Sequence, residues 1–202
     1  KSLSPGTPNS EAAWQEALKA APNANGRRTL YLDKEQRKNL LQSIGEEAAP
    51  FVQALCLLPL RPGAMAALTA GDFDKRTSEL TIGKDKTGKP RRIQLPTKAA
   101  ALFAEQAKAK LPGAPLFMRA NGVAWDKNSW KVPIAAAVKA AELPKGATAY
   151  TLRHSTITDL VSAGLPLLTI AQISGTSAEM IERHYGHLAS DAAVKALGKL
   201  VL

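Results

Sequence analysis

The chain has 202 residues, a hydrophobic content of 45% and a formal net charge of +10 at pH 7. A chain of this length and apolar content can bury one sizeable core, which excludes disorder throughout. The pI of about 9.8 favours a polyanionic partner, because basic side chains that neutralise phosphates release counterions. Charge alone leaves open a basic protein without a nucleic-acid partner.

The chain lacks the patterns of a membrane or secreted protein. Its apolar runs are too short to span a bilayer, and no charged stretch precedes an apolar one as in a signal peptide. The single cysteine, Cys56, lies in the apolar run 51–58, so no intrachain disulfide can form and a small core residue is expected. No Cys/His cluster has the spacing of metal ligands. We therefore expect a cytoplasmic protein without a metal.

Residues 1–28 are predicted to form a flexible N-terminal segment, since the first ten residues are rich in Ser, Pro and Gly. A short helix over 11–21, capped by Ser10, is the one element expected there. A folded domain is expected over 29–202. In this domain Asp33 is placed to cap a helix, and Pro50 suits the first turn of a mostly buried helix that reaches Leu58.

Two short strand patterns, 79–83 and 91–95, are joined by a basic turn and predict a small antiparallel sheet. Helical patterns follow after Thr97, separated by Gly and Pro clusters. They cover Lys98–Leu111, Trp130–Glu142, Thr151–Ala163, Pro166–Ile173, Ser177–Tyr185 and Asp191–Leu200. The predicted fold class is therefore α+β, mostly α-helical with a small antiparallel β-sheet.

Residue types suited to phosphate chemistry occur in motifs spread along the chain. Arg61 lies in Leu-Pro-Leu-Arg-Pro-Gly, which closes one apolar helix and opens another. Arg153 lies in Ala-Tyr-Thr-Leu-Arg-His-Ser, and Tyr185 lies further on in Arg-His-Tyr-Gly-His-Leu. Lys86 directly precedes the Thr-Gly pair of the basic turn. Each motif alone is weak evidence, but their common order and spacing are informative.

Together these motifs resemble the tyrosine recombinases, the phage integrase family, from about Tyr31 to the C-terminus. The resemblance implies that Tyr185 attacks a scissile DNA phosphate and forms a 3′-phosphotyrosyl link. It also implies that Arg61 and Arg153 hold the phosphate, and that Lys86 protonates the leaving 5′ oxygen. A tyrosine hydroxyl, with a pKa near ~10, needs such cations, because they stabilise the charge that develops on the phosphate oxygens.

Three positions depart from the family pattern: Ala64 replaces an acidic residue, and Tyr150 and Thr176 replace imidazole or indole side chains. Tyr150 and Thr176 retain hydroxyl donors, so we keep both as candidate catalytic residues that hydrogen-bond the phosphate. Neither is a good base at pH 7. The alternative hypothesis is therefore a catalytically impaired DNA-binding protein on a recombinase scaffold.

Further side chains are predicted to contact DNA outside the reacting phosphate. Basic residues of the turn and its flanks favour backbone contacts, and histidines near the tyrosine motif favour either a phosphate contact or acceptance of the tyrosine proton. A packing role for the histidines stays open. The predicted DNA-binding residues are Lys84, Lys89, Arg91, Arg92, His154 and His184.

The C-terminal part of the chain indicates how mobile the tyrosine is and how the protein assembles. Tyr185 shares an apolar helical stripe with Ile181, and Gly186 is expected to end that helix and leave the tyrosine near a mobile end. A second stripe through Val194, Leu197 and Val201 either packs on its own domain or, as the resemblance implies, docks on a neighbouring protomer.

The resemblance implies a site-specific recombinase acting on double-stranded DNA as a homo-tetramer, with no cofactor. It further implies the catalytic domain alone, without the separate N-terminal domain that completes the DNA clamp, at work on a bacterial chromosome or mobile element. A type IB topoisomerase, which relaxes DNA by the same chemistry, is the nearest alternative.

Overall fold

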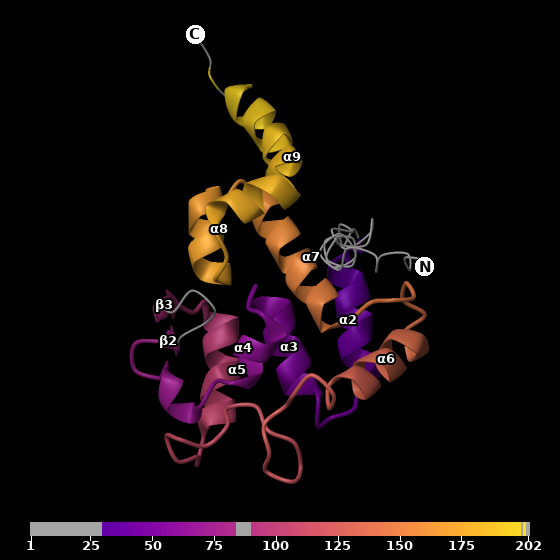
Figure 1. Cartoon of the computed structure of the whole chain (residues 1–202), viewed down its shortest axis with the longest axis vertical. Coiled ribbons are helices and arrows are strands. Elements are labelled where there is room, and N and C mark those ends of the chain that lie inside the picture. The colour runs from indigo at the N-terminus through magenta and orange to yellow at the C-terminus, as the bar shows by residue number, and fades with distance from the viewer. Residues whose placement is uncertain (1–29, 84–89, 199, 201–202) are drawn as a thin grey trace, which may run out of the picture.

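The computed structural model describes residues 30–83, 90–198 and 200 of the chain. The helix expected over 11–21 and the predicted site residues Lys84, Lys86 and Lys89 lie outside these residues. Within them the order of elements is α2 (Lys34–Ser43), α3 (Ala49–Leu57), α4 (Pro62–Ala66), η1 (Ala70–Asp72), β1 (Phe73–Asp74), β2 (Glu79–Ile82), β3 (Arg91–Gln94), α5 (Thr97–Ala107), α6 (Lys131–Ala140), α7 (Ala149–Ser162), α8 (Leu167–Ser174) and α9 (Ala178–Leu197) (Figure 1).

Local capping chemistry fixes the starts of several helices. The Asp33 carboxylate accepts from the Gln36 amide at 2.8 Å, and the Gln36 side chain accepts from the Asp33 amide, which completes a capping box at α2. Proline occupies the first turn of α3, where its missing N–H costs no hydrogen bond. Thr148 and Thr151 form a second capping box that starts α7. The predicted starts of α2 and α3 are confirmed.

The sheet is antiparallel with strand order β1-β2-β3. Leu80 pairs with Phe73 on one side and with Ile93 on the other, and all three side chains are buried. The sequence patterns predicted β2 and β3 but missed β1, which has only two residues. The expected fold class, mostly helical with a small antiparallel sheet, is confirmed.

Helix α7 joins two hydrophobic clusters. Its first half packs into the main core, where Phe51 stacks on Trp125 and Trp130 at centroid distances of 5.8 and 5.5 Å. Its second half supplies Ile157 and Val161 to a smaller cluster with α8 and α9. In Figure 1 α7 accordingly runs between the body of the molecule and the end formed by α8 and α9. Residues carried on α7 therefore lie where the two parts meet.

The two helices predicted at the C-terminus are one helix, so that prediction is wrong. Helix α9 continues through Gly186, which was expected to end it. A glycine inside a helix costs only about 1 kcal/mol relative to alanine, which the surrounding helix formers offset. Past its packed first half, α9 projects away from the body (Figure 1), and Val194 and Leu197 are exposed rather than packed on their own domain.

Two helix ends also differ from the sequence prediction. Helix α5 ends at Ala107 rather than at residue 111: Lys108 leaves the helical conformation with ψ of 132°, and Ala109 then adopts a left-handed one with φ of 57°. Helix α6 ends at Ala140 rather than at residue 142, and Glu142 there has φ of 51°. Hydrophobic periodicity carries no signal for such conformations in non-glycine residues.

One buried ion pair links the start of the domain to α7. The Arg37 guanidinium is almost fully buried and pairs with the Asp159 carboxylate, which also accepts from the Tyr31 hydroxyl at 2.8 Å. A buried cation of this kind is costly without its counter-ion. The pair therefore fixes α2 against α7.

We expect Asp159→Asn to lower the free energy of unfolding by about 3 kcal/mol, because Arg37 keeps its buried charge and loses its partner. Tyr31→Phe is the matched control and removes one hydrogen bond, worth about 1 kcal/mol. Urea unfolding followed by circular dichroism measures both changes. Equal losses in the two variants would contradict a dominant role for the ion pair.

Candidate active site

Two arginines from distant parts of the sequence meet at the C-terminal end of α8. Arg61, the residue before α4, donates from Nη1 to the Gly175 carbonyl at 2.5 Å. Arg153, on α7, donates from Nη1 to the carbonyls of Ser174 at 2.8 Å and Pro59 at 2.5 Å. The last carbonyls of a helix have no intrahelical partner and carry its partial negative charge, so they attract guanidinium groups.

The two arginines bring positive charges close together at a site where Arg153 is largely shielded from solvent. Burial, and secondarily the nearby Arg61 charge, lowers the pKa of the Arg153 guanidinium to about 10. The Arg91 charge acts in the same direction, which places this β3 residue within electrostatic reach of Arg153. The two acceptors of Arg153 are neutral carbonyls, which satisfy its N–H groups without neutralising its charge.

Tyr185 lies beside this charged group in the smaller hydrophobic cluster. It projects from α9, is 8% exposed, and packs with Ile157, Val161 and Ile181. Burial raises the pKa of the Tyr185 hydroxyl, and the Arg153 charge lowers it by a smaller amount. The hydroxyl is thus held protonated near neutral pH, within electrostatic reach of the Arg153 guanidinium.

The Tyr185 hydroxyl has a specific partner in His154. The distance from the hydroxyl oxygen to His154 Nδ1 is 2.9 Å, and the two ring centroids are 5.2 Å apart. Burial, followed by the neighbouring His184 ring, lowers the pKa of His154. A neutral imidazole with its proton on Nε2 accepts through Nδ1, so the Tyr185 hydroxyl is the donor in this state.

The two hydroxyl residues that depart from the family pattern also lie near the arginines. Tyr150 is on the first turn of α7, is 41% exposed, and its phenol acts electrostatically on Arg153. Thr176 is half-buried and directly follows Gly175, the acceptor of Arg61. Ala64 lies half-buried within α4 and has no polar group to offer.

The predicted DNA-binding residues divide between this site and the surface. On β3, Arg91 is half-buried near Arg153, whereas Arg92 is exposed and pairs with Glu79 at 3.5 Å. Neighbouring residues of a strand point to opposite faces, which explains the division. The His184 ring stands edge-on to Tyr185 at a centroid distance of 6.5 Å.

The sequence motifs missed the groups that position the arginines. These groups are the backbone carbonyls of Pro59, Ser174 and Gly175. Gly175 ends α8 in the left-handed conformation with φ of 69°, as expected for a glycine after an apolar helix. In the sequence, Gly175 was the one signal for these acceptors, because a glycine after an apolar helix marks a helix end, where the carbonyls lack partners within the helix.

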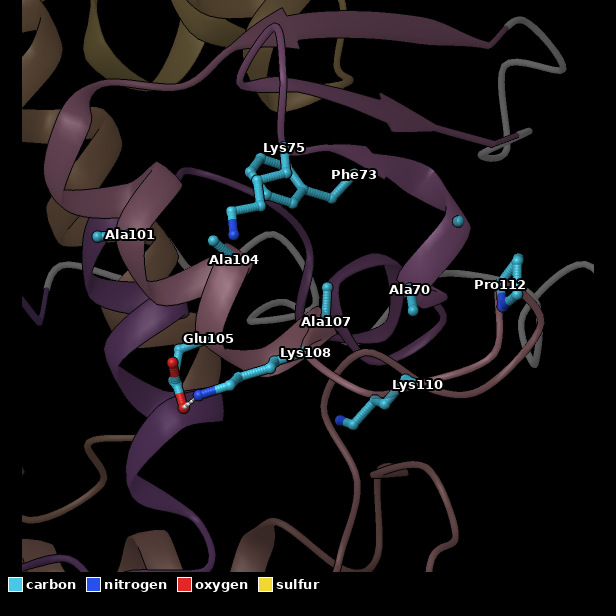
Figure 2. A pocket seen from close by; sticks show the side chains of 11 residues that line it. Ala70, Phe73, Lys75, Ala101, Ala104, Glu105, Ala107, Lys108, Lys110 and Pro112 are labelled. Carbon is cyan, nitrogen blue, oxygen red and sulfur yellow. Dashed lines mark ion pairs between the residues drawn. The ribbon is translucent and has the colours of Figure 1, made fainter.

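A separate open pocket of about 430 Å³ lies under α5 (Figure 2). Two of the lysines that line it have partners: Lys108 pairs with Glu105 at 3.9 Å, and Lys110 donates to the Leu116 carbonyl at 2.7 Å. None of the predicted site residues that the structure describes lines it. This pocket is therefore distinct from the arginine and tyrosine site.

The described residues contain neither a metal-binding cluster nor a membrane-spanning helix. Among residues 30–83, 90–198 and 200, no group of three or more His, Cys, Asp or Glu side chains is arranged to hold a metal ion. No helix in the same residues is long and apolar enough to cross a membrane.

Comparison with known proteins gives a family and several similar folds. Residues 31–191 match the model of the phage integrase family. The fold is similar to the Tn1549 transposon integrase in complex with a circular intermediate DNA, with a TM-score of 0.75, 19% identity, and coverage of 94% of this chain and 75% of that chain. Sequence comparison with curated proteins gave no significant match.

Two further solved structures share the fold. XerA recombinase gives a TM-score of 0.67 at 20% identity, covering 94% of this chain and 73% of the other. The catalytic domain of bacteriophage HP1 integrase gives a TM-score of 0.62 at 21% identity, covering 84% of this chain and 94% of that domain. At these identities the likeness is one of fold.

We expect His154 to titrate below its ordinary pKa of about 6.5 in the folded protein and close to it in urea. Because the unfolded chain binds this proton more tightly, His154 makes the fold less stable as the pH falls below about 6.5. NMR of the histidine Cε1–H groups, assigned with His154→Gln, measures the midpoint. A native midpoint at or above the unfolded one would contradict this expectation.

Proposed function

This chain belongs to the phage integrase family, and we propose that it is the catalytic domain of a site-specific DNA recombinase. It would cleave and rejoin DNA strands through a 3′-phosphotyrosyl intermediate. The observation that supports this most directly is the meeting of Arg61 and Arg153 at one helix end, beside the buried hydroxyl of Tyr185. Two guanidinium groups next to a phenol suit attack on a phosphodiester.

In the proposed step, the Tyr185 oxygen attacks phosphorus and the bond from phosphorus to the 5′ oxygen breaks. Arg61 and Arg153 stabilise the charge on the nonbridging oxygens, and Tyr150 and Thr176 add hydroxyl donors. The free 5′ hydroxyl of a partner strand then reverses the step. The phosphotyrosyl bond retains the energy of the phosphodiester, so the step as written needs neither metal nor nucleotide.

Lys86 is the proposed proton donor to the leaving 5′ oxygen. The lysine itself lies outside the described residues, but it precedes Arg91 by a few positions in the sequence. The support is the position of Lys86 in the sequence shortly before β3, whose first residue, Arg91, lies within electrostatic reach of Arg153. A lysine close to other cations has a lowered pKa, which suits a general acid.

Double-stranded DNA is the proposed partner. The net charge of +10 favours a polyanion, and the similar Tn1549 integrase was solved with transposon DNA. We further propose that the protein assembles on DNA as a tetramer, with the exposed apolar residues of α9, Val194 and Leu197, packed against a neighbouring protomer. The site of action would be a bacterial chromosome or mobile element.

A second candidate function is DNA binding without cleavage. Thr176 and the exposed Tyr150 favour it, since hydroxyl groups stand where the family has stronger proton-transfer groups. A covalent adduct on a nicked suicide duplex separates the two candidates. Strand exchange between two duplexes, rather than relaxation of one, then separates a recombinase from a topoisomerase.

We expect Tyr185→Phe to abolish the covalent adduct and to leave noncovalent DNA binding within about twofold, because only the nucleophilic oxygen is removed. Denaturing electrophoresis measures the adduct, and a mobility shift at fixed salt measures binding. Tyr31→Phe is the control, since its hydroxyl donates to Asp159, the partner of Arg37 rather than of Arg61 or Arg153. An adduct in the Tyr185→Phe protein would assign the nucleophile elsewhere.

We expect Lys86→Ala to slow cleavage of a normal phosphodiester by roughly 10²- to 10⁴-fold, the scale of a lost general acid. A substrate with sulfur at the bridging 5′ position should restore the rate, because a thiolate leaves without protonation. Arg61→Ala and Arg153→Ala should stay slow on the same substrate. Equal defects of Lys86→Ala on both substrates would assign Lys86 to DNA positioning, and sulfur rescue of Lys84→Ala or Lys89→Ala would identify another lysine as the acid.

A further inference from the structure

The hydroxyl proton of Tyr185 must be removed before or during attack, and the Lys86 acid acts on the opposite side of the reaction. Burial makes spontaneous loss of this proton unfavourable at neutral pH, since the phenolate would lie among Ile157, Val161 and Ile181. The site therefore needs a proton acceptor within hydrogen-bond distance of the hydroxyl oxygen.

We propose that His154 is the general base that accepts the Tyr185 proton through Nδ1. The 2.9 Å hydrogen bond between these atoms has the distance that the proton transfer needs. The proposal rests on the recombinase function proposed above, because the base has a purpose only if Tyr185 is the nucleophile. It assigns a second reacting residue to α7, adjacent to Arg153.

The pair is held by packing on both sides. Ile157, one turn after His154 on α7, and Ile181, one turn before Tyr185 on α9, belong to the same buried cluster. This contact fixes the separation of the two helices and so the distance between imidazole and hydroxyl. The burial that lowers the pKa of His154 also keeps Nδ1 unprotonated and ready to accept.

Other side chains near the tyrosine are poorer acceptors. Tyr150 and Thr176 offer hydroxyl groups, which are not bases at neutral pH. The His184 ring stands edge-on to the Tyr185 ring at a centroid distance of 6.5 Å, compared with 5.2 Å for His154. His154 is the histidine whose ring nitrogen meets the hydroxyl oxygen.

The proton balance of the step is complete without a further reactant. The O–H bond of Tyr185 breaks and its proton moves to His154 Nδ1, while the tyrosine oxygen bonds to phosphorus. The bond from phosphorus to the 5′ oxygen breaks at the same centre, and Lys86 supplies the proton to that oxygen. On rejoining, the imidazolium returns its proton to Tyr185 as the phosphotyrosyl bond breaks.

The test compares His154→Gln with the unchanged chain on a nicked suicide duplex, whose sequence is selected from a random pool by binding to this chain. Glutamine can accept a hydrogen bond from Tyr185 but cannot take its proton. We expect adduct formation to slow by roughly 10²- to 10⁴-fold, with DNA binding within about twofold. His187→Gln is the matched control, since His187 is exposed on the same helix, and should react within about threefold of the unchanged chain.

A more acidic phenol distinguishes a base from a residue that only positions the tyrosine. Fluorotyrosine at position 185 should raise the rate of His154→Gln by at least about tenfold, because a phenol of lower pKa gives up its proton with less help from a base. It should not restore Arg61→Ala, whose defect is in charge stabilisation. A slow His154→Gln protein without this rescue would overturn the base assignment, as would a rate within threefold of the unchanged chain.

His154→Ala provides an independent variant if glutamine disturbs the fold. Added imidazole should raise its rate of adduct formation and leave the unchanged chain unaffected; no response to imidazole would overturn the proposal. Failure of the proposed function gives a different result. In that case the unchanged chain itself forms no adduct at Tyr185, whatever residue stands at position 154.

Discussion

The half-buried guanidinium of Arg153 is the group on which the rest of the site depends. It donates to the carbonyl of Pro59, before α4, and to that of Ser174, at the end of α8, so one side chain connects three segments. Withdrawing a cation from water is costly, and neutral carbonyls repay only part of that cost. Burial and the nearby Arg61 charge lower the pKa of Arg153, and a bound anion would raise it again.

The fold could be predicted from the sequence wherever local chemistry decides the outcome. Asp33 and Pro50 carry capping signals that act within one turn, and the helices they start were correctly expected. The errors concern conformations that tertiary packing imposes. A glycine such as Gly186 often ends a helix, but α9 continues past it. The turns before Gly186 are fixed by Ile181 and Tyr185, which pack in a buried cluster. The two-residue strand β1 exists only because β2 lies beside it.

The candidate site could be predicted in part, because its charged residues belong to motifs. Arg61 and Arg153 were expected to converge, and the structure brings both to one helix end. Backbone carbonyls hold the two arginines in place. Every residue has a carbonyl, so the sequence does not show which of them will accept these hydrogen bonds. The pairing of His154 with Tyr185 was equally hidden, since it depends on how α7 and α9 pack. The sequence left several roles open for that histidine, and the 2.9 Å contact is the observation from which we propose one of them.

Helix α9 carries two features at a fixed separation: Tyr185 in the buried cluster and the exposed apolar residue Leu197 near its other end. At 1.5 Å per residue, roughly 18 Å of helix length separates them. A partner bound to the exposed end would therefore be connected to the tyrosine by helix alone, with no loop between the two positions. Gly186 directly follows the tyrosine, and glycine lowers the cost of bending a helix, so a change in the direction of the far end would be taken up next to the hydroxyl.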